Sequence, residues 1–306
     1  MTMFRSDRIR LAGMAATAAL LWLTPAQAQQ SFNSPDDAAA ALVAAVKSGM
    51  KQDILKVLGP QGEDIVTSGD DVADTAARNK FIVAYDAKHV IKTEGKRATL
   101  YIGTDDYPFS VPLYRTKSGG WEFDTDRGRR ELLFRRIGQN EIDTIHTCLA
   151  FVDAQDEYAG KDRGEGAGVY AQRIVSSPGK TDGLYWPSDK NDSPLGALAA
   201  DAAAEGYKAG DEPRPYHGYY YRVLTQQGAS APGGAMSYIV KGRMIGGFAL
   251  VAWPADYANS GVVTFMVSHS GIVYEKDLGE NTTAIVKSMI SFDPDKSWRK
   301  VDEPHD

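Results

Sequence analysis

Apolar residues recur at helical spacing near the start of this 306-residue chain. Leu42, Val43 and Val46 lie on one face of a segment that opens with Ser34-Pro35 and is followed by Gly49. A serine cap, a proline in the first turn and a glycine at the end are the usual boundary signals of an α-helix. The pattern therefore predicts a helix between Ser34 and Gly49.

Two more helices and a sheet are predicted in the next 75 residues. One helix covers about 52–58, and the other begins at Asp70 or Asp71 and carries Phe81 and Tyr85 on one face. Three alternating or β-rich runs follow, separated by polar turns: 97–102, 108–114 and 121–123. These runs predict a three-stranded antiparallel meander. Helices followed by a curved sheet are typical of an α+β unit of the nuclear-transport-factor-like kind.

A long helical pattern covers residues 126–158. Ile142, Ile145, Leu149 and Val152 recur at three and four, so one face packs and the other is wet. Gly138 predicts a break, and we therefore expect the helix in two pieces.

The remainder of the chain begins with a loop and becomes strongly β. Residues 160–193 are rich in Gly, Asp, Ser and Pro, which predicts a long ordered loop. Ser193-Pro194 is expected to cap an alanine-rich helix that ends near Gly206. The β runs are 219–224, 238–240, 244–253, 262–268 and 272–274. Ser270-Gly271 predicts a tight hairpin turn, and residues 280–290 predict a last helix.

The predicted fold class is therefore α+β, in two units. Residues 29–125 form helices plus a curved antiparallel sheet, residues 126–292 form a long helix packed on a C-terminal antiparallel sheet, and residues 293–306 form a frayed tail. The second unit is loosely similar to the globular heads of pilins and pseudopilins. The first helix of that family begins with an apolar membrane segment of ~20 residues. Here the corresponding helix is polar at Gln139-Asn140-Glu141, which argues against a polymerising pilin.

The first 28 residues carry an export signal. Arg5, Arg8 and Arg10 precede an apolar run at 11–23, and the small residues Ala26 and Ala28 follow it. This is the pattern of a secretory signal peptide, with cleavage predicted between Ala28 and Gln29. The expected location is periplasmic or secreted. No second apolar run approaches ~18 residues, so no stable membrane insertion is expected after cleavage.

Charge and cysteine content narrow the function classes further. The formal net charge is −6, and loss of three arginines and one aspartate with residues 1–28 makes it −8. Nucleic acid is excluded as a partner, because neutralising phosphates needs a positive excess. Cys148 is the single cysteine, so no intrachain disulfide can form.

Short segments along nearly the whole chain after residue 28 resemble one bacterial family. They include Ser177-Pro178-Gly179-Lys180-Thr181-Asp182-Gly183-Leu184-Tyr185-Trp186-Pro187, Pro215-Tyr216-His217-Gly218-Tyr219, Gly246-Gly247-Phe248-Ala249-Leu250-Val251-Ala252-Trp253-Pro254 and Val273-Tyr274-Glu275-Lys276-Asp277-Leu278-Gly279. On these segments the chain resembles the family catalogued as domain of unknown function 2950. The resemblance implies an exported envelope protein and carries no assigned activity.

His217 is the one candidate for catalysis. A histidine beside glycine at the mouth of a sheet can serve as a general base, and Ser177, Lys180 or a carboxylate would complete the site. The alternative is a hydrogen-bonded turn residue. Cys148 and His146 do not form a nucleophile pair, because residues at i and i+2 of a helix point apart; we expect Cys148 to be buried.

No metal site or cofactor is predicted. The histidines are scattered, and neither an HxxxH nor a CxxC pattern occurs. Gly246-Gly247 is not followed by the Lys-Ser/Thr and the helix of a phosphate loop.

The favoured interpretation is a non-catalytic binding or envelope-assembly module. Aromatic loop residues are expected to line a groove between the two units, with five candidate ligand-binding positions: Tyr185, Trp186, Tyr216, His217 and Tyr219. The expected partner is an envelope protein or a cell-wall fragment. Two alternatives stay open, an envelope hydrolase that uses His217 and a pilin-like structural subunit.

Overall fold

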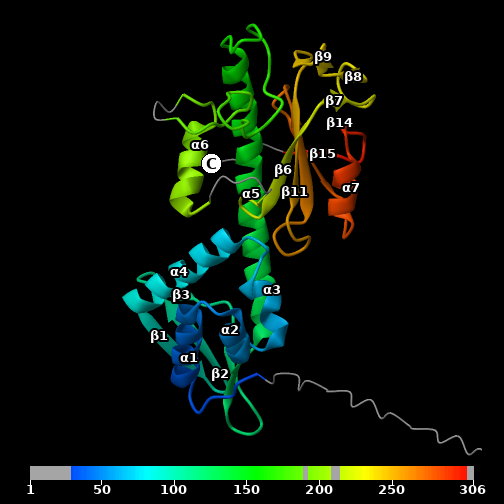
Figure 1. Ribbon diagram of the computed structural model, residues 1–306. Helices are drawn as coiled ribbons and strands as arrows, with labels where there is room; N and C mark the ends of the chain where they lie inside the picture. Colours follow the sequence, from blue (N-terminus) through cyan, green and yellow to red (C-terminus); the bar gives the residue numbers. More distant parts are fainter. Residues whose placement is uncertain (1–28, 189–191, 208–213, 302–306) are drawn as a thin grey trace, which may run out of the picture.

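The computed structural model of the protein describes residues 29–188, 192–207 and 214–301. The predicted signal peptide, residues 1–28, lies outside the described residues. The fold is mixed α+β, as predicted, with a helical and sheet-containing N-terminal half, one long helix, and a C-terminal half dominated by an antiparallel sheet (Figure 1).

The N-terminal half places helices on one face of a small sheet. Its helical elements are α1 (Pro35–Ser48), α2 (Lys51–Leu58), the 3-10 turn η1 (Pro60–Gly62), α3 (Glu63–Val66) and α4 (Asp71–Ala87). Its strands are β1 (His89–Glu94), β2 (Arg97–Ile102), β3 (Tyr107–Pro108), β4 (Leu113–Arg115) and β5 (Trp121–Phe123). The strands pair antiparallel in the order β1-β2-β4-β5, with β3 also on β2.

The helix signals read from the sequence act as predicted. The Ser34 hydroxyl accepts from the Asp37 N–H, and Gly49 ends α1 in the left-handed conformation at φ 70°. Asp70 is the cap of α4. The meander of β2, β4 and β5 is confirmed, but β1 was not predicted. All but one of its residues are exposed, so the strand has no buried face that an alternation of apolar and polar residues would reveal.

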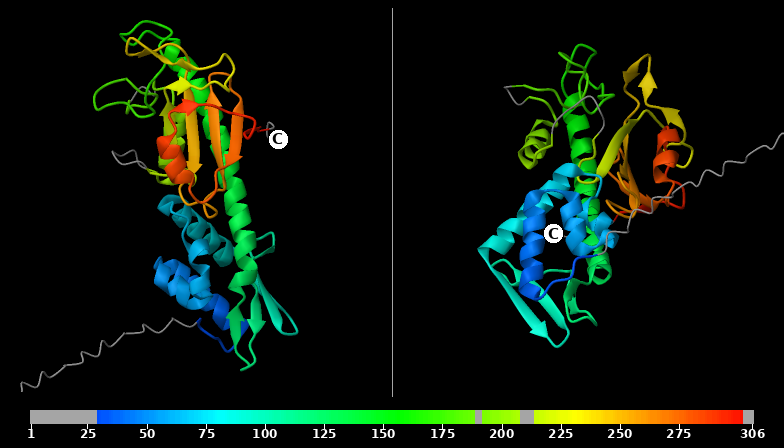
Figure 2. Two further views of the ribbon diagram at one scale, coloured as in Figure 1. Left: turned by 90° about the vertical axis from the view of Figure 1, so that its right-hand side faces the viewer. Right: turned by 60° about the horizontal axis from the view of Figure 1, so that its bottom comes forward.

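Helix α5 (Thr125–Ala159) connects the two halves (Figures 1 and 2). It is continuous over 35 residues, so the predicted break at Gly138 is wrong. Glycine inside a helix costs only about 1 kcal/mol relative to alanine, and packing along the rest of the helix offsets that. Leu132 packs on the N-terminal core and Ile145 belongs to the C-terminal core, so α5 is shared by both halves.

The C-terminal half is built on a five-stranded antiparallel sheet in the order β15-β13-β12-β11-β6. These strands are β6 (Tyr219–Leu224), β11 (Ala249–Pro254), β12 (Val263–Ser268), β13 (Val273–Asp277) and β15 (Arg299–Lys300). Short strands form two further small sheets, one of β14 (Ser291–Phe292), β7 (Gln226–Gln227) and β8 (Met236–Ser237), the other of β9 (Ile239–Val240) and β10 (Arg243–Met244). Helix α5 packs on one face of the sheet and α7 (Thr282–Ser288) on the other (Figure 1).

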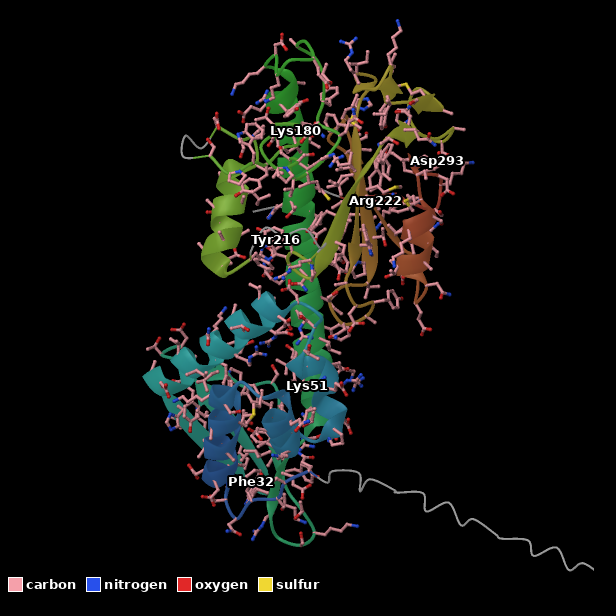
Figure 3. The ribbon with its side chains drawn as sticks, in the orientation of Figure 1. Phe32, Lys51, Lys180, Tyr216, Arg222 and Asp293 are labelled. Atoms are coloured by element: carbon pink, nitrogen blue, oxygen red, sulfur yellow. The ribbon has the colours of Figure 1, made fainter. Side chains whose placement is uncertain are left out.

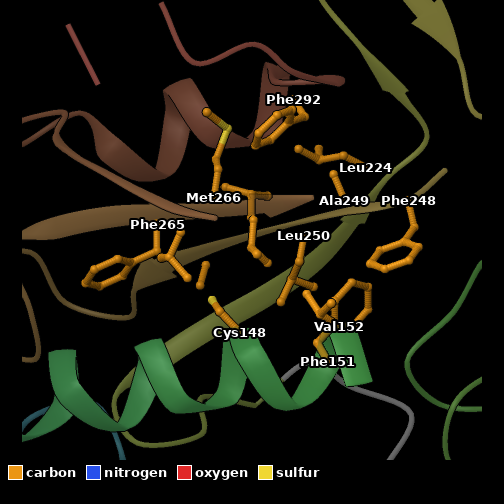
Figure 4. Packing of buried hydrophobic residues seen from close by; sticks show 14 of the residues in the cluster. Cys148, Phe151, Val152, Leu224, Phe248, Ala249, Leu250, Phe265, Met266 and Phe292 are labelled. Atoms are coloured by element: carbon orange, nitrogen blue, oxygen red, sulfur yellow. The ribbon is translucent and has the colours of Figure 1, made fainter. Parts of the chain in front are cut away.

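The core of this half covers both faces of the sheet, with α5 packed on one side and Phe292 and Met266 on the side of α7 (Figure 4). Phe151 and Val152 on α5 meet Leu250 and Phe248 from the sheet side, and Phe151 packs edge-on against Phe248 at 5.7 Å between ring centroids. Cys148 lies in the same layer with no exposed surface, as predicted. Burial raises the pKa of its thiol to about 12, so the thiol stays protonated and unreactive.

Two boundary predictions are wrong. Helix α6 (Gly196–Glu205) begins after Leu195 without a side-chain cap, because Ser193 instead uses its carbonyl to accept from the Gly196 N–H. The expected tail is ordered as far as Val301: β15 pairs with β13, and Trp298 packs on the core. A two-residue strand is too short to show a period in the sequence.

Candidate functional site

His217 lies in a tight turn between Tyr216 and Tyr219. Tyr216 and Tyr219 exchange backbone hydrogen bonds of 2.8 and 3.1 Å, and the two residues between them have positive φ, 50° at His217 and 73° at Gly218. This is the conformation of a hairpin turn that favours Asn-Gly. A histidine in the left-handed region is uncommon, so the turn holds the imidazole in place at a cost in backbone strain.

The imidazole faces two carboxylates. Nδ1 lies 3.5 Å from Asp143 Oδ2 on α5, and Nε2 lies 3.5 Å from Glu205 Oε2 at the end of α6. The Tyr216 ring packs 4.1 Å from the imidazole, measured between centroids, and burial raises the Tyr216 pKa to about 12. Each ring nitrogen therefore has a carboxylate as its neighbour.

The same turn is bonded to the N-terminal half through Asp70. The Asp70 carboxylate is buried and accepts from the Tyr207 hydroxyl at 2.8 Å and from the Gly218 N–H at 3.0 Å. Its other oxygen accepts from two N–H groups in the first turn of α4. The His217 N–H donates to the Tyr207 oxygen at 3.3 Å. The turn is thus part of a junction between the two halves.

A second junction lies beside it on Arg136. This guanidinium donates to the Asp64 and Ile65 carbonyls at 2.6 and 2.8 Å, and to Asn259 Oδ1 at 2.6 Å. Burial lowers its pKa. Asn259 in turn donates to the Thr67 carbonyl at 2.9 Å. Arg136 therefore crosslinks α5, the α3 segment and the loop before β12.

Tyr219 does not line a groove. Its side chain is fully buried, and its hydroxyl donates to the Val263 carbonyl at 3.0 Å. Gly261 lies so close to this ring that a Cβ added at position 261 would be 2.1 Å from the Tyr219 hydroxyl oxygen. Tyr219 is a core residue that anchors β6 to β12.

Tyr185 and Trp186 lie in the loop that follows α5, which is ordered by specific bonds. The buried amide of Gln155 donates to and accepts from the backbone of Ala171, both at 2.8 Å. The Asp182 carboxylate accepts a hydrogen bond from the Ser177 N–H at 2.7 Å and one from the Ser177 hydroxyl at 2.9 Å. Both bonds lower the pKa of Asp182, and the bond from the N–H has the larger effect. Ser177 is therefore committed to its own loop and does not contact His217.

An open cavity of about 550 Å³ lies between the end of α5 and this loop. The lining residues that carry charge are Lys161, Arg163, Glu165, Arg173, Lys180 and Asp182. Arg163 donates to the Tyr158 carbonyl at 2.6 Å and packs over the rings of Tyr158 and Trp186, 4.4 and 5.5 Å from their centroids. Trp186 thus lies next to the cavity.

The five predicted ligand-binding residues do not meet in one recess. Tyr216 and His217 lie beside Asp143, whereas Trp186 is tied through Arg163 to Tyr158. Fifteen residues of α5 separate those two positions, which is about 22 Å along the helix. Figure 3 shows the same separation, with Lys180 near the upper end of α5 and Tyr216 near its middle.

The sequence did not predict most of the residues around His217 or around the cavity at the end of α5. Asp70 was predicted only as a helix cap, and nothing in its surroundings indicated partners at Tyr207 and Gly218. Arg163 and Arg173 lie in a loop without periodicity. Within residues 29–188, 192–207 and 214–301, no group of three or more His, Cys, Asp or Glu is arranged to hold a metal ion.

No helix among the described residues combines the length and apolar composition that a bilayer crossing requires. Comparison with curated proteins and with solved structures finds no match. The sequence model of the family described as protein of unknown function (DUF2950) does match, over residues 29–301. Because this match covers nearly the whole chain, the protein belongs to the DUF2950 family.

Proposed function

We propose that this protein is an exported, non-catalytic binding module of the cell envelope, and that its ligand site is the cavity at the end of α5. The observation that carries the proposal is the pre-ordered wall of that cavity. A fully buried amide, Gln155, and an internally bonded loop, Ser177 to Asp182, hold the lining in place without a ligand. Sites whose walls are ordered beforehand lose less entropy on binding.

A hydrolase built on His217 has less support. Its ring nitrogens face Asp143 and Glu205, and among the described residues no hydroxyl or thiol forms a hydrogen bond with the imidazole. Ser177 is bonded to Asp182, and Cys148 is buried and protonated. The residues around His217 instead join the two halves of the molecule.

The ligand site can be tested with soluble cell-wall fragments. We expect a digest of peptidoglycan to raise the melting temperature of residues 29–306, because ligand at about 100 times Kd stabilises a protein by about 2.7 kcal/mol. Arg163→Gln should abolish the rise, whereas Lys117→Gln, in the exposed turn before β5, should leave it unchanged.

Because Arg163→Gln also alters the loop, amide chemical shifts of the unmodified protein give a second measurement. Shifts on adding the digest should concentrate in residues 158–182. An unchanged melting temperature together with unchanged shifts would refute the ligand site.

The export part of the proposal rests on the pattern of residues 1–28. We expect the full chain, expressed in a Gram-negative cell, to appear in the periplasmic fraction with Gln29 as its first residue, measured by mass spectrometry of the purified protein. A chain that starts at Met followed by Gln29 should stay in the cytoplasm. An unprocessed full chain in the cytoplasmic fraction would contradict export.

A further inference from the structure

The charge of the cavity at the end of α5 has the opposite sign to that of the whole molecule. Four cations and two carboxylates line the cavity, which leaves a local charge of +2, whereas the chain carries −6. A concave site with an excess of one sign of charge raises the local concentration of oppositely charged ligands.

Several of these charged groups are already engaged by the protein. Lys161 pairs with Glu157 at 3.1 Å, one turn earlier on α5. Asp182 accepts two bonds from Ser177 and lies within the electrostatic reach of Arg173. The Asp182 carboxylate is therefore hydrogen-bonded within its own loop.

Three cations of the lining remain: Arg163, which the protein holds in position, and Arg173 and Lys180, which form no close pair among the described residues. Nη1 of Arg163 is used by the Tyr158 and Lys161 carbonyls, and among the described residues its Nε and Nη2 have no acceptor. Within the same part of the chain, the Arg173 guanidinium and the Lys180 ammonium form no hydrogen bond or close ion pair, and both are exposed. Glu165 is the one carboxylate of the lining without a side-chain partner there.

The stacking of Arg163 makes it more than a surface charge. Its guanidinium lies against the rings of Tyr158 and Trp186, and the Tyr158 hydroxyl donates to the Thr181 carbonyl at 2.8 Å, which ties the far wall of the cavity to α5. Contacts with two rings and a hydrogen bond to the Tyr158 carbonyl restrict the guanidinium, while its Nε and Nη2 have no acceptor in the described part of the chain and stay free to donate. Planar carboxylates and phosphates are the groups that such N–H donors bind best.

We infer that the ligand of this cavity carries an anionic group, which binds the free N–H groups of Arg163 together with the side chains of Arg173 and Lys180. The inference rests on the proposed function and names its ligand class. A volume of about 550 Å³ suits a disaccharide-peptide fragment better than a bare ion. Carboxylates of a cell-wall peptide are the source we favour, and a phosphate group is the other source of the same chemistry.

The test compares two probes that differ only in charge. One is a disaccharide tetrapeptide of peptidoglycan with free carboxylates, and the other is the same molecule with its carboxylates amidated; inorganic phosphate is a third probe. By isothermal titration calorimetry we expect the acidic probe to bind at least about tenfold more tightly than the amidated one, and its affinity to fall as salt is raised. Competition by phosphate at millimolar concentration would assign the site to phosphate groups instead of carboxylates.

Variants separate this inference from the proposed function. The double variant Arg173→Gln/Lys180→Gln should bind the acidic probe about tenfold more weakly and leave the amidated probe unaffected, and Lys117→Gln serves as the matched control for loss of one exposed cation. Equal binding of the two disaccharide probes, or an unchanged affinity of the double variant, would overturn the anionic class while the binding function stands. Binding of none of the three probes would overturn both.

Discussion

Asp70→Ala is expected to lower the free energy of unfolding by about 3–5 kcal/mol. Loss of the helix cap on α4 accounts for about 1 kcal/mol of this. The larger part comes from the Tyr207 hydroxyl and the Gly218 N–H, because each buried donor left without an acceptor costs about 1–3 kcal/mol. The measurement is urea denaturation followed by circular dichroism on residues 29–306.

Two further variants identify the source of that loss. Asp70→Asn keeps one acceptor oxygen and replaces the other with an NH2 group. Its free energy of unfolding should therefore fall between those of the wild type and Asp70→Ala. Tyr207→Phe removes one of the donors, and combining it with Asp70→Ala should cost less than the sum of the two single changes. A total loss near 1 kcal/mol for Asp70→Ala would mean that Asp70 is only a helix cap and does not join the two halves.

Two glycines of α5 should respond to alanine in opposite directions. A Cβ at Gly128 would lie 2.6 Å from the Val111 Cα and 2.7 Å from the Ser110 carbonyl oxygen. Because two of these contacts are with backbone atoms, α5 would have to move away from the Ser110-Val111 segment, and overpacking of this kind costs about 1–3 kcal/mol or more. At Gly138 no atom lies within 4 Å of the added Cβ, so Gly138→Ala should stabilise by about 0.5–1 kcal/mol.

Thermal and urea denaturation of the two variants measure this pair of effects directly. Both substitutions add one methyl group to the same helix, so each is the control for the other with respect to helix propensity. Stabilisation by Gly128→Ala would show that α5 and the Ser110-Val111 segment are not in close contact. Destabilisation by Gly138→Ala would mean that the helix is not continuous there.

Elements whose signals are local could be predicted from the sequence, and elements that depend on distant contacts could not. The cap, proline and glycine around α1 are all within the helix or next to it, and the aromatic and β-branched residues that predict β6 and β12 lie in those strands themselves. β1 carries no such signal because it is exposed on both sides, and Gly138 was misread because its break is prevented by packing at both ends of α5. The finer likenesses, to the nuclear-transport-factor and pilin folds, stay predictions.

The candidate site divides in the same way. The sequence singled out His217 and Trp186 as candidate ligand-binding residues, but the residues that surround them come from far along the chain. Asp143 is 74 residues before His217 and Glu205 is on another helix, while the partner of Trp186 is Arg163 in a loop. No spacing rule connects residues that meet only after α5 has packed on the sheet.

The uninterrupted length of α5 has a consequence for how far apart its two ends are held. Thirty-five helical residues span about 52 Å, so α5 sets a fixed distance between the elements that pack at its two ends. A ligand bound in the cavity as proposed would stay at a fixed distance from a molecule bound at the opposite end of α5, and the two would not contact each other.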